Sequence, residues 1–242
     1  MRHNQQKSLE IEMFDHMAQN GGYFSVSRDK YLTVMNLLGL ENTVERKPLV
    51  LDIGCGIGEQ AEIIKSIGNN VVGVDISYNA IRVAKAKSVE KALGIDYIVA
   101  DIENLPFKEE VFDICFCGLV FHHFPELSEV ARQIHNVLGK KGKVFSYDPN
   151  GFNPYEFLGT HVIKRLGGVA WKSENERFIF PRELRRTFSE AGCHTFTFQS
   201  ILLFSEKKMS LFYRLRRLVY KSLYILMPKI SRGNMLVMKC EK

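Results

Sequence analysis

The sequence predicts an α/β fold in which a seven-stranded, mostly parallel sheet carries helices on both faces. Three observations support this. The segment VLDIGCGIGEQ, residues 50–60, joins an apolar strand to a glycine-rich turn and the start of a helix. The segments 71–77 and 96–107 each contain a further apolar strand that ends in an acidic residue. Helical patterns separate the strands, and such alternation is typical of a parallel sheet.

The first strand and its loop have the composition of a ligand-binding turn. Leu49, Val50 and Leu51 form the unbroken apolar run of a strand that is buried on both faces. Glycines at 54, 56 and 58 let the backbone turn sharply and approach a ligand without interference from Cβ atoms. A dinucleotide fingerprint would place its third glycine at position 59, where this chain has Glu59. Pyrophosphate is therefore not the expected ligand, and a nicotinamide-dependent oxidoreductase is disfavoured.

The remaining elements follow in a regular order. Helices are expected within four segments, at 9–47, 79–93, 126–138 and 180–192. After the first strand, further strands are expected within six segments, at 71–77, 96–107, 111–124, 143–150, 193–204 and 234–240. A turn is expected at 139–142, before the fifth strand. The segment 180–192 has proline near its start and glycine at its end, which fits the termini of a helix.

Length and composition predict one globular domain. The chain has 242 residues, of which 45% are apolar, and this suffices for one sizeable core. The amino terminus has no apolar run of signal-peptide length, and no stretch of 18 uncharged apolar residues occurs, so a cytoplasmic location is expected. The five cysteines are expected to be reduced, packed thiols. No metal site is expected, because Cys115 and Cys117 fit an ordinary core pattern on a buried strand.

The positive charge is concentrated near the carboxyl terminus. Residues 201–242 hold ten Lys and Arg against two Glu, a net charge of +8. The whole chain has a net charge of +6, so residues 1–200 carry −2. Within this region, 209–227 has the pattern of an amphipathic helix with Leu211, Leu215 and Leu218 on its apolar side. Such a helix can contact an anionic membrane surface or a partner. The alternative is a helix that only covers the sheet.

The motifs, taken in order, resemble those of the class I S-adenosylmethionine-dependent methyltransferases. The loop reads D-x-G-x-G-x-G, and Asp75 follows its last glycine by 17 residues at the end of the second strand. Asp101 ends the third strand, and paired histidines follow the fourth. This resemblance covers 48–149 and implies a Rossmann-like sheet whose antiparallel seventh strand pairs with the sixth. It divides the chain into a helical cap (1–47), a cofactor-binding core (48–149) and two inserts above the active-site mouth (150–181 and 205–233).

The resemblance also implies S-adenosyl-L-methionine as the cofactor. The glycine loop and the end of the fourth strand would hold its methionine portion, Asp75 its ribose, and Asp101 its adenine. The expected cofactor-binding residues are Asp52, Gly54, Cys55, Gly56, Gly58, Asp75, Ile76, Asp101, Ile102, Cys117, Gly118 and Tyr23. Tyr23 is the weakest of these, since it rests only on the tendency of aromatic residues before the first strand to cover the cofactor.

Three residues are candidates for catalysis. A methyl transfer needs the nucleophile placed in line and, for a hydroxyl, a base that removes its proton. His122 and His123 follow the fourth strand, and a neutral imidazole can accept a proton near pH 7. Asp148, at the end of the fifth strand, has a similar claim. In the alternative, the histidines only line the cofactor pocket or begin the next helix, and Asp148 is a turn residue before proline.

The two inserts favour a small or lipid-like acceptor, methylated at oxygen or carbon. Both are rich in aromatic residues and are long for loops of a compact domain. The alternatives are an RNA or protein methyltransferase that docks through its basic helix, or an inactive cofactor-binding partner subunit. DNA is disfavoured, because the motif of amino methylation is missing after the fourth strand and no Pro-Cys pair, as carbon-5 cytosine methylation often uses, occurs in the chain. We expect peripheral membrane contact through 209–227.

Overall fold

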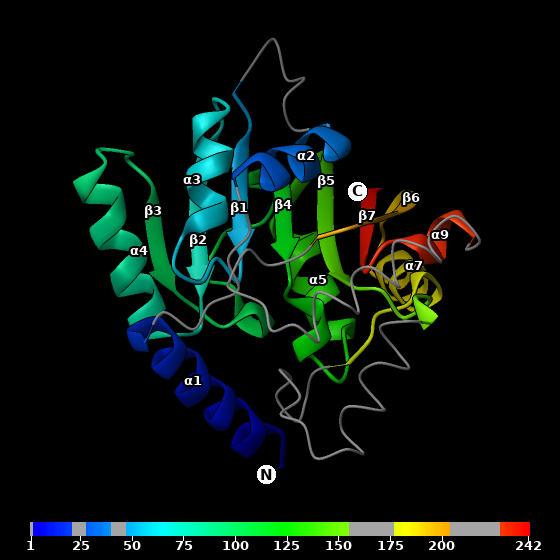
Figure 1. The fold of residues 1–242 in the computed structure, drawn as a ribbon, viewed down its shortest axis with the longest axis horizontal. Helices are drawn as coiled ribbons and strands as arrows, with labels where there is room; N and C mark the ends of the chain where they lie inside the picture. The colour runs from blue at the N-terminus through cyan, green and yellow to red at the C-terminus, as the bar shows by residue number, and fades with distance from the viewer. Residues whose placement is uncertain (1, 21–27, 40–46, 155–176, 204–227) are drawn as a thin grey trace, which may run out of the picture.

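A computed structural model describes residues 2–20, 28–39, 47–154, 177–203 and 228–242 (Figure 1). Its centre is one seven-stranded sheet in the order β3-β2-β1-β4-β5-β7-β6. The strands are β1 (Leu49–Ile53), β2 (Asn70–Asp75), β3 (Asp96–Val99), β4 (Phe112–Gly118), β5 (Leu138–Pro149), β6 (His194–Ile201) and β7 (Met235–Glu241). The predicted α/β sheet of seven strands is confirmed.

The direction of the strands also agrees with the prediction. β1 pairs in parallel with β2 and β4, β2 with β3, and β4 with β5. β7 lies antiparallel between β5 and β6. The first strands of the chain thus end at one edge of the sheet, where an open α/β sheet binds its ligands.

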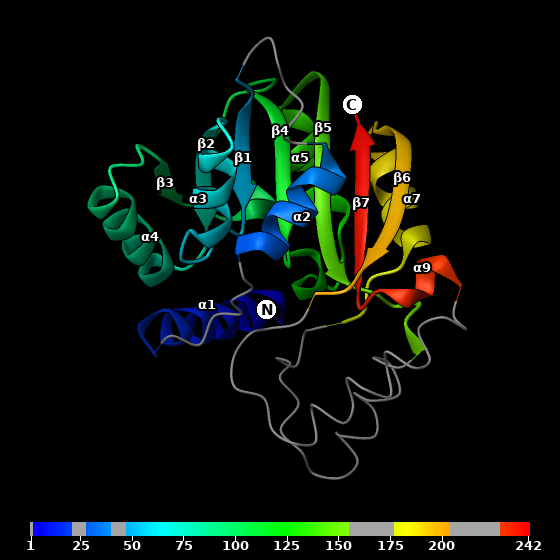
Figure 2. The ribbon, with the colours of Figure 1, turned by 45° about the horizontal axis from the view of Figure 1, so that its top comes forward.

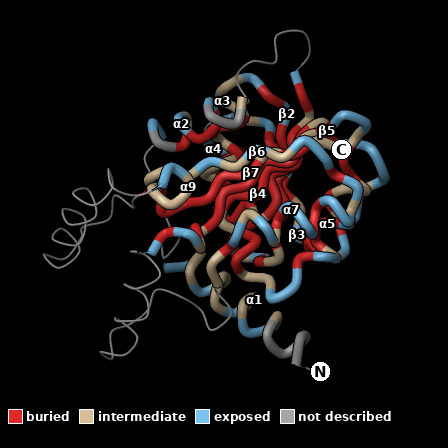
Figure 3. Tube along the Cα trace, turned by 90° about the vertical axis from the view of Figure 1, so that its right-hand side faces the viewer, coloured by how far each residue is buried: buried red, intermediate tan, exposed pale blue. Residues whose placement is uncertain are grey.

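Helices cover both faces of the sheet and create two apolar cores. One core joins the sheet to α2 (Arg28–Leu38), α3 (Glu59–Ser66) and α4 (Tyr78–Glu90). The other joins it to α5 (Ser128–Val137) and α7 (Pro181–Glu190). Adjacent strand residues face opposite sides, so on β1 Val50 enters the first core and Leu51 the second. Figure 3 shows the buried strands between these layers.

The remaining helices flank the carboxyl ends of the strands. α1 (Arg2–Asn20) lies beside the ends of the first strands (Figure 2). The single-turn helices η1 (Ile102–Asn104) and η2 (Phe121–His123) follow β3 and β4, and α9 (Lys229–Arg232) precedes β7. Among the described helices, none is both long and apolar enough to cross a membrane.

The predicted turn at 139–142 is wrong. β5 already begins at Leu138, which pairs with Phe112, whereas the next pair joins Ile114 to Lys143. The extra residues on β5 form a bulge in which Lys141 has a φ of 63°. A bulge absorbs extra residues without ending a strand, which explains why turn-like glycines occur inside β5. The helix α1 also starts earlier than the segment expected from the pattern.

Several predictions lie outside the described residues. These are the cofactor contact of Tyr23, the amphipathic helix at 209–227, and most of the two inserts. All five cysteines are buried and none forms a disulfide, as expected.

Candidate functional site

The glycine loop between β1 and α3 is built for close approach of a ligand. Gly54, Gly56 and Gly58 all have positive φ, at 66°, 52° and 84°. Other residues rarely adopt this conformation. A Cβ on Gly54 would lie 2.5 Å from the Val120 side chain, so space also requires glycine there. The loop directs its backbone toward the edge where β2 and β4 end.

Asp75 ties this loop to the end of β2. Its carboxylate accepts the N–H of Gly56 at 2.8 Å and the N–H of Ser77 at 2.9 Å. Burial raises the pKa of Asp75, and these two hydrogen bonds oppose that rise. Each carboxylate oxygen can accept a further hydrogen bond, so the side chain can both hold the loop and receive hydroxyl groups from a ligand.

Two acceptor oxygens beside the loop have no protein partner in the described part of the chain. Asp52 is 1% exposed, and its Oδ2 lacks a hydrogen bond, as does Oε1 of Gln60 on α3. Burial and the nearby charge of Asp75 raise the pKa of Asp52. A Cβ on Gly118 would lie 2.1 Å from Gln60 Oε1, so the end of β4 closes over this side chain. Unpaired buried acceptors are unfavourable, and a ligand with N–H donors would satisfy them.

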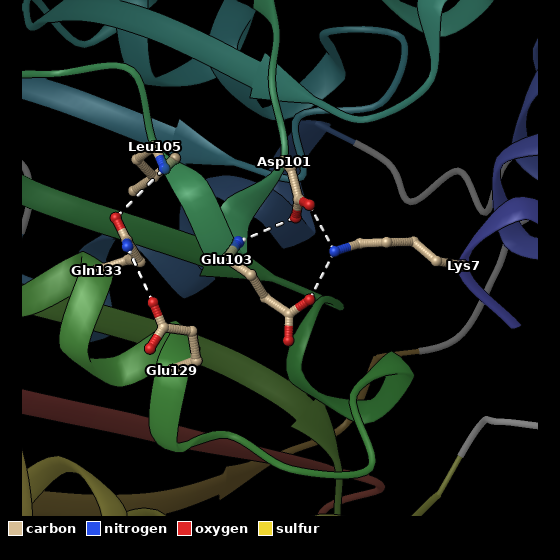
Figure 4. Close-up of polar contacts among 6 residues, drawn as sticks. All are labelled: Lys7, Asp101, Glu103, Leu105, Glu129 and Gln133. Carbon is tan, nitrogen blue, oxygen red and sulfur yellow. Dashed lines mark hydrogen bonds and ion pairs between the residues drawn. The ribbon is translucent and has the colours of Figure 1, made fainter. Parts of the chain in front are cut away.

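Asp101, at the end of β3, contacts α1 through an ion pair. Lys7 Nζ lies 2.5 Å from Asp101 Oδ2 and 2.6 Å from Glu103 Oε2, between the two carboxylates (Figure 4). Partial burial lowers the pKa of Lys7, but the hydrogen bonds and charges of Asp101 and Glu103 together outweigh this effect. The pKa of Lys7 is therefore above its ordinary value. Asp101 Oδ1 accepts the N–H of Glu103 at 3.0 Å, which caps η1.

Further contacts hold α1 across the edge of the sheet. Asp15 accepts hydrogen bonds from the hydroxyl of Ser77 and, at 3.1 Å, from the N–H of Asn79 at the start of α4. Phe14 packs edge-on against His123, with 5.1 Å between ring centroids. Glu10 Oε1 lies 3.7 Å from His123 Nδ1, which is too long for a hydrogen bond. Helix α1 therefore covers the candidate ribose and adenine residues.

His122 and Asp148 form a buried pair. The Nδ1 atom of His122 lies 2.9 Å from Asp148 Oδ1, which also accepts the backbone N–H of His122 at 3.2 Å. Burial raises the pKa of Asp148, whereas neighbouring backbone N–H groups and Arg177 oppose the rise. The pair lies just beyond the point where Gly118 of β4 pairs with Tyr147 of β5. The ring of His123 packs against that of His122, with 4.1 Å between centroids and 39° between the ring planes, and it also contacts Phe14 of α1.

The structure brings most predicted site residues to one edge but gives some of them packing contacts. Ile102 belongs to the apolar core, at 7% exposure, and Ile76 is half-buried. Cys55 and Cys117 are buried thiols whose pKa burial raises, so they contribute backbone and packing instead of reactive sulfur. Sequence reasoning missed Gln60, Lys7 and Asp15, because nothing in their local patterns links them to β4, β3 or α4.

Comparison with known proteins places this geometry in a family. Residues 51–146 match a family model described as a methyltransferase domain. A ubiquinone biosynthesis O-methyltransferase of Hahella chejuensis is 32% identical, over 72% of this chain and 76% of that protein. The chain belongs to the class I S-adenosylmethionine-dependent methyltransferases. The fold is similar to that of a solved S-adenosylmethionine-dependent methyltransferase from Thermotoga maritima, a possible histamine N-methyltransferase. The two chains are 17% identical with a TM-score of 0.61, and the match covers 96% of this chain and 99% of that one.

In two other curated relatives the match covers only part of the relative's length. A malonyl-[acyl-carrier protein] O-methyltransferase of Hamiltonella defensa is 33% identical over 58% of this chain. The chain spans 51% of the length of that relative and 60% of that of another curated relative. Membership in the family therefore rests on relatives such as the Hahella chejuensis protein, of which the chain covers 76%.

The residues at this edge fit the family's cofactor, S-adenosylmethionine. The unpaired oxygens of Asp52 and Gln60 suit the ammonium group of its methionine portion, and the glycine loop leaves room beside them. Asp75 has acceptor capacity for ribose hydroxyls, and Asp101 for the adenine amino group. Asp52 and Asp75 are buried, so little water would compete for hydrogen bonds to their carboxylates, whereas Asp101 is partly exposed.

Proposed function

We propose that the protein transfers a methyl group from S-adenosylmethionine to a hydroxyl oxygen of a small or lipid-like acceptor. When bound, the cofactor supplies a methyl group activated by its sulfonium. The task of the protein is then to hold the acceptor oxygen in line and to remove its proton. The observation that carries the proposal is the His122–Asp148 pair beside the end of β4.

Asp148 sets the tautomer of His122 in this proposal. A carboxylate at 2.9 Å favours a hydrogen on Nδ1, which donates to it. In a neutral imidazole the proton acceptor is then Nε2, and Asp148 stabilises the imidazolium that forms when Nε2 takes the acceptor's proton. His122 is the proposed base, and Asp148 is a positioning residue.

The relatives support oxygen as the methylated atom. Two of them bear the names of O-methyltransferases that act in ubiquinone biosynthesis or on malonyl-acyl-carrier protein. An inactive cofactor-binding subunit would have no need of a buried histidine–aspartate pair. Docking of RNA or protein, or contact with a membrane, through 209–227 stays a prediction, because that segment lies outside the described residues.

The first test is binding. Calorimetric titration should detect S-adenosylmethionine and give no signal with a nicotinamide dinucleotide. A panel of phenols, catechols and carboxylic acids can then be tested for formation of S-adenosylhomocysteine. Failure of the cofactor to bind would refute the proposal.

The second test separates the two histidines. His122→Asn should lower kcat by about a hundred- to ten-thousandfold, the usual contribution of a general base. His123→Asn, the matched control, should act mainly on cofactor binding, since His123 contacts α1. Near-normal turnover by His122→Asn would show that positioning alone carries the reaction.

A further inference from the structure

A surface hollow lies where the chain leaves β5 and enters α7. It has a volume of about 640 Å³ and is lined by Phe152, Phe180, Arg182, Glu183 and Arg186. Phe152 follows β5, Phe180 directly precedes α7, and Arg182, Glu183 and Arg186 lie in the first two turns of α7. None of the predicted cofactor-binding or catalytic residues lines it, whereas Phe152 and Phe180 belong to the first aromatic-rich insert, 150–181, which is expected to favour an apolar acceptor.

One side of the hollow is aromatic. Phe152 and Phe180 are 41% and 36% exposed, although large apolar side chains are usually buried. Their rings meet edge-to-face with 5.7 Å between centroids. Phe180 lies so close to Gly151 that a Cβ there would be 2.5 Å from the ring. The aromatic pair is therefore held in place while part of its surface faces solvent, as expected of a binding site for an apolar group.

The other side of the hollow is positively charged. Glu183 is neutralised by Arg177, whose guanidinium nitrogens donate to its carboxylate at 2.8 and 2.6 Å. Arg182 and Arg186 are exposed, one turn apart on α7, and form no ion pair with any described residue. Arg185 on the same helix is engaged elsewhere, because its guanidinium lies 5.3 and 5.4 Å from the ring centroids of Phe196 and Phe198 on β6. Two arginines thus remain available to an anion.

Arg177 connects the hollow to the catalytic pair. Its backbone N–H donates to the carbonyl of His122 at 3.1 Å, and its Nε donates to the carbonyl of Phe124 at 2.7 Å. On the other side, Phe152 follows Asp148 by only four residues. The hollow and the catalytic pair are therefore connected through the contacts of one residue, Arg177.

We propose that this hollow binds the acceptor through an apolar chain or ring against Phe152 and Phe180 and an anionic group, carboxylate or phosphate, at Arg182 and Arg186. The inference rests on the proposed function and narrows its acceptor class to amphipathic anions. Guanidinium groups recognise carboxylate and phosphate through paired hydrogen bonds. Neither an uncharged lipid nor a polar anion without an apolar part satisfies both sides of the hollow.

The test uses decyl phosphate, below its micelle concentration, with decanol as the uncharged control. In calorimetric titration of the full chain, decyl phosphate should bind at least about tenfold more tightly than decanol. The variant Arg182→Gln/Arg186→Gln should lose this difference. The matched control Arg185→Gln, on the same helix, should bind as the wild type does, within about twofold. Phe180→Ser should weaken both ligands, because both need the aromatic side.

Titration of every variant with S-adenosylmethionine keeps the two proposals separate. If the cofactor binds normally and decyl phosphate binds equally well to wild type and double variant, or to neither, the hollow has no such role. A protein that binds phosphatidylglycerol vesicles but not monomeric decyl phosphate would also overturn the inference, because its arginines then act on a surface. If the wild type does not bind S-adenosylmethionine, the proposed function is refuted. The effect of the arginine substitutions on decyl phosphate binding would still show whether the hollow binds amphipathic anions.

Discussion

Replacing Asp75 by Asn tests the core of the cofactor site. The change keeps the size of the side chain but leaves only one acceptor oxygen where the carboxylate has two. Gly56 and Ser77 donate to different oxygens of Asp75, so the new amide nitrogen must face one of these N–H groups. A buried N–H left without a partner costs about 1–3 kcal/mol. The glycine loop should therefore loosen in the absence of any ligand.

The effect on the cofactor adds to this loss. Hydrogen bonds to a charged group contribute about 1.5–3 kcal/mol, so the dissociation constant for S-adenosylmethionine should rise by about ten- to a hundredfold. Calorimetry gives the dissociation constant, and urea denaturation gives the free energy of unfolding of the ligand-free protein. Asp96→Asn is the control, because Asp96 is exposed at the start of β3. A folded Asp75→Asn protein with an unchanged dissociation constant would refute the assignment of Asp75 to the ribose.

Two further variants test the surroundings of the site. Lys7→Gln should speed cofactor dissociation about two- to fivefold in stopped-flow experiments, since a partly exposed ion pair contributes about 0.5–1 kcal/mol. The control Lys108→Gln changes an exposed lysine and should leave the dissociation rate as in the wild type. Equal rates for Lys7→Gln and the wild type would show that the Lys7–Asp101 pair does not hold α1 over the cofactor site. Burial raises the pKa of Asp52, so the folded state binds its proton more tightly than the unfolded state, and the contribution of Asp52 to stability falls as pH rises above about 4. Asp52→Asn should therefore flatten the pH dependence of the free energy of unfolding and stabilise the ligand-free protein at pH 7, as urea denaturation at pH 5 and pH 8 would show. A pH dependence identical to the wild type would contradict this.

Local sequence predicted the elements of the fold well for physical reasons. The run from Leu49 to Leu51 and the glycines at 54, 56 and 58 have backbone requirements that few other conformations satisfy. The turn predicted at 139–142 failed, because whether a bulge or a turn forms there depends on pairing with β4, which lies more than twenty residues away in sequence. The identity of residues 139–142 does not reveal whether they pair with a distant strand.

The sequence by itself determined the order of strands and helices, the conformation of the glycine loop, and the acids at the ends of β2 and β3. Each of these depends on the residue's own backbone preference or on the apolar pattern of its neighbours. Only the tertiary structure decided which candidates act together. His122 and Asp148 are 26 residues apart and meet because β4 and β5 are parallel neighbours. Lys7 reaches Asp101 across 94 residues because α1 lies over the sheet edge. Contacts of this kind depend on how distant segments of the chain pack together, so local sequence patterns cannot predict them.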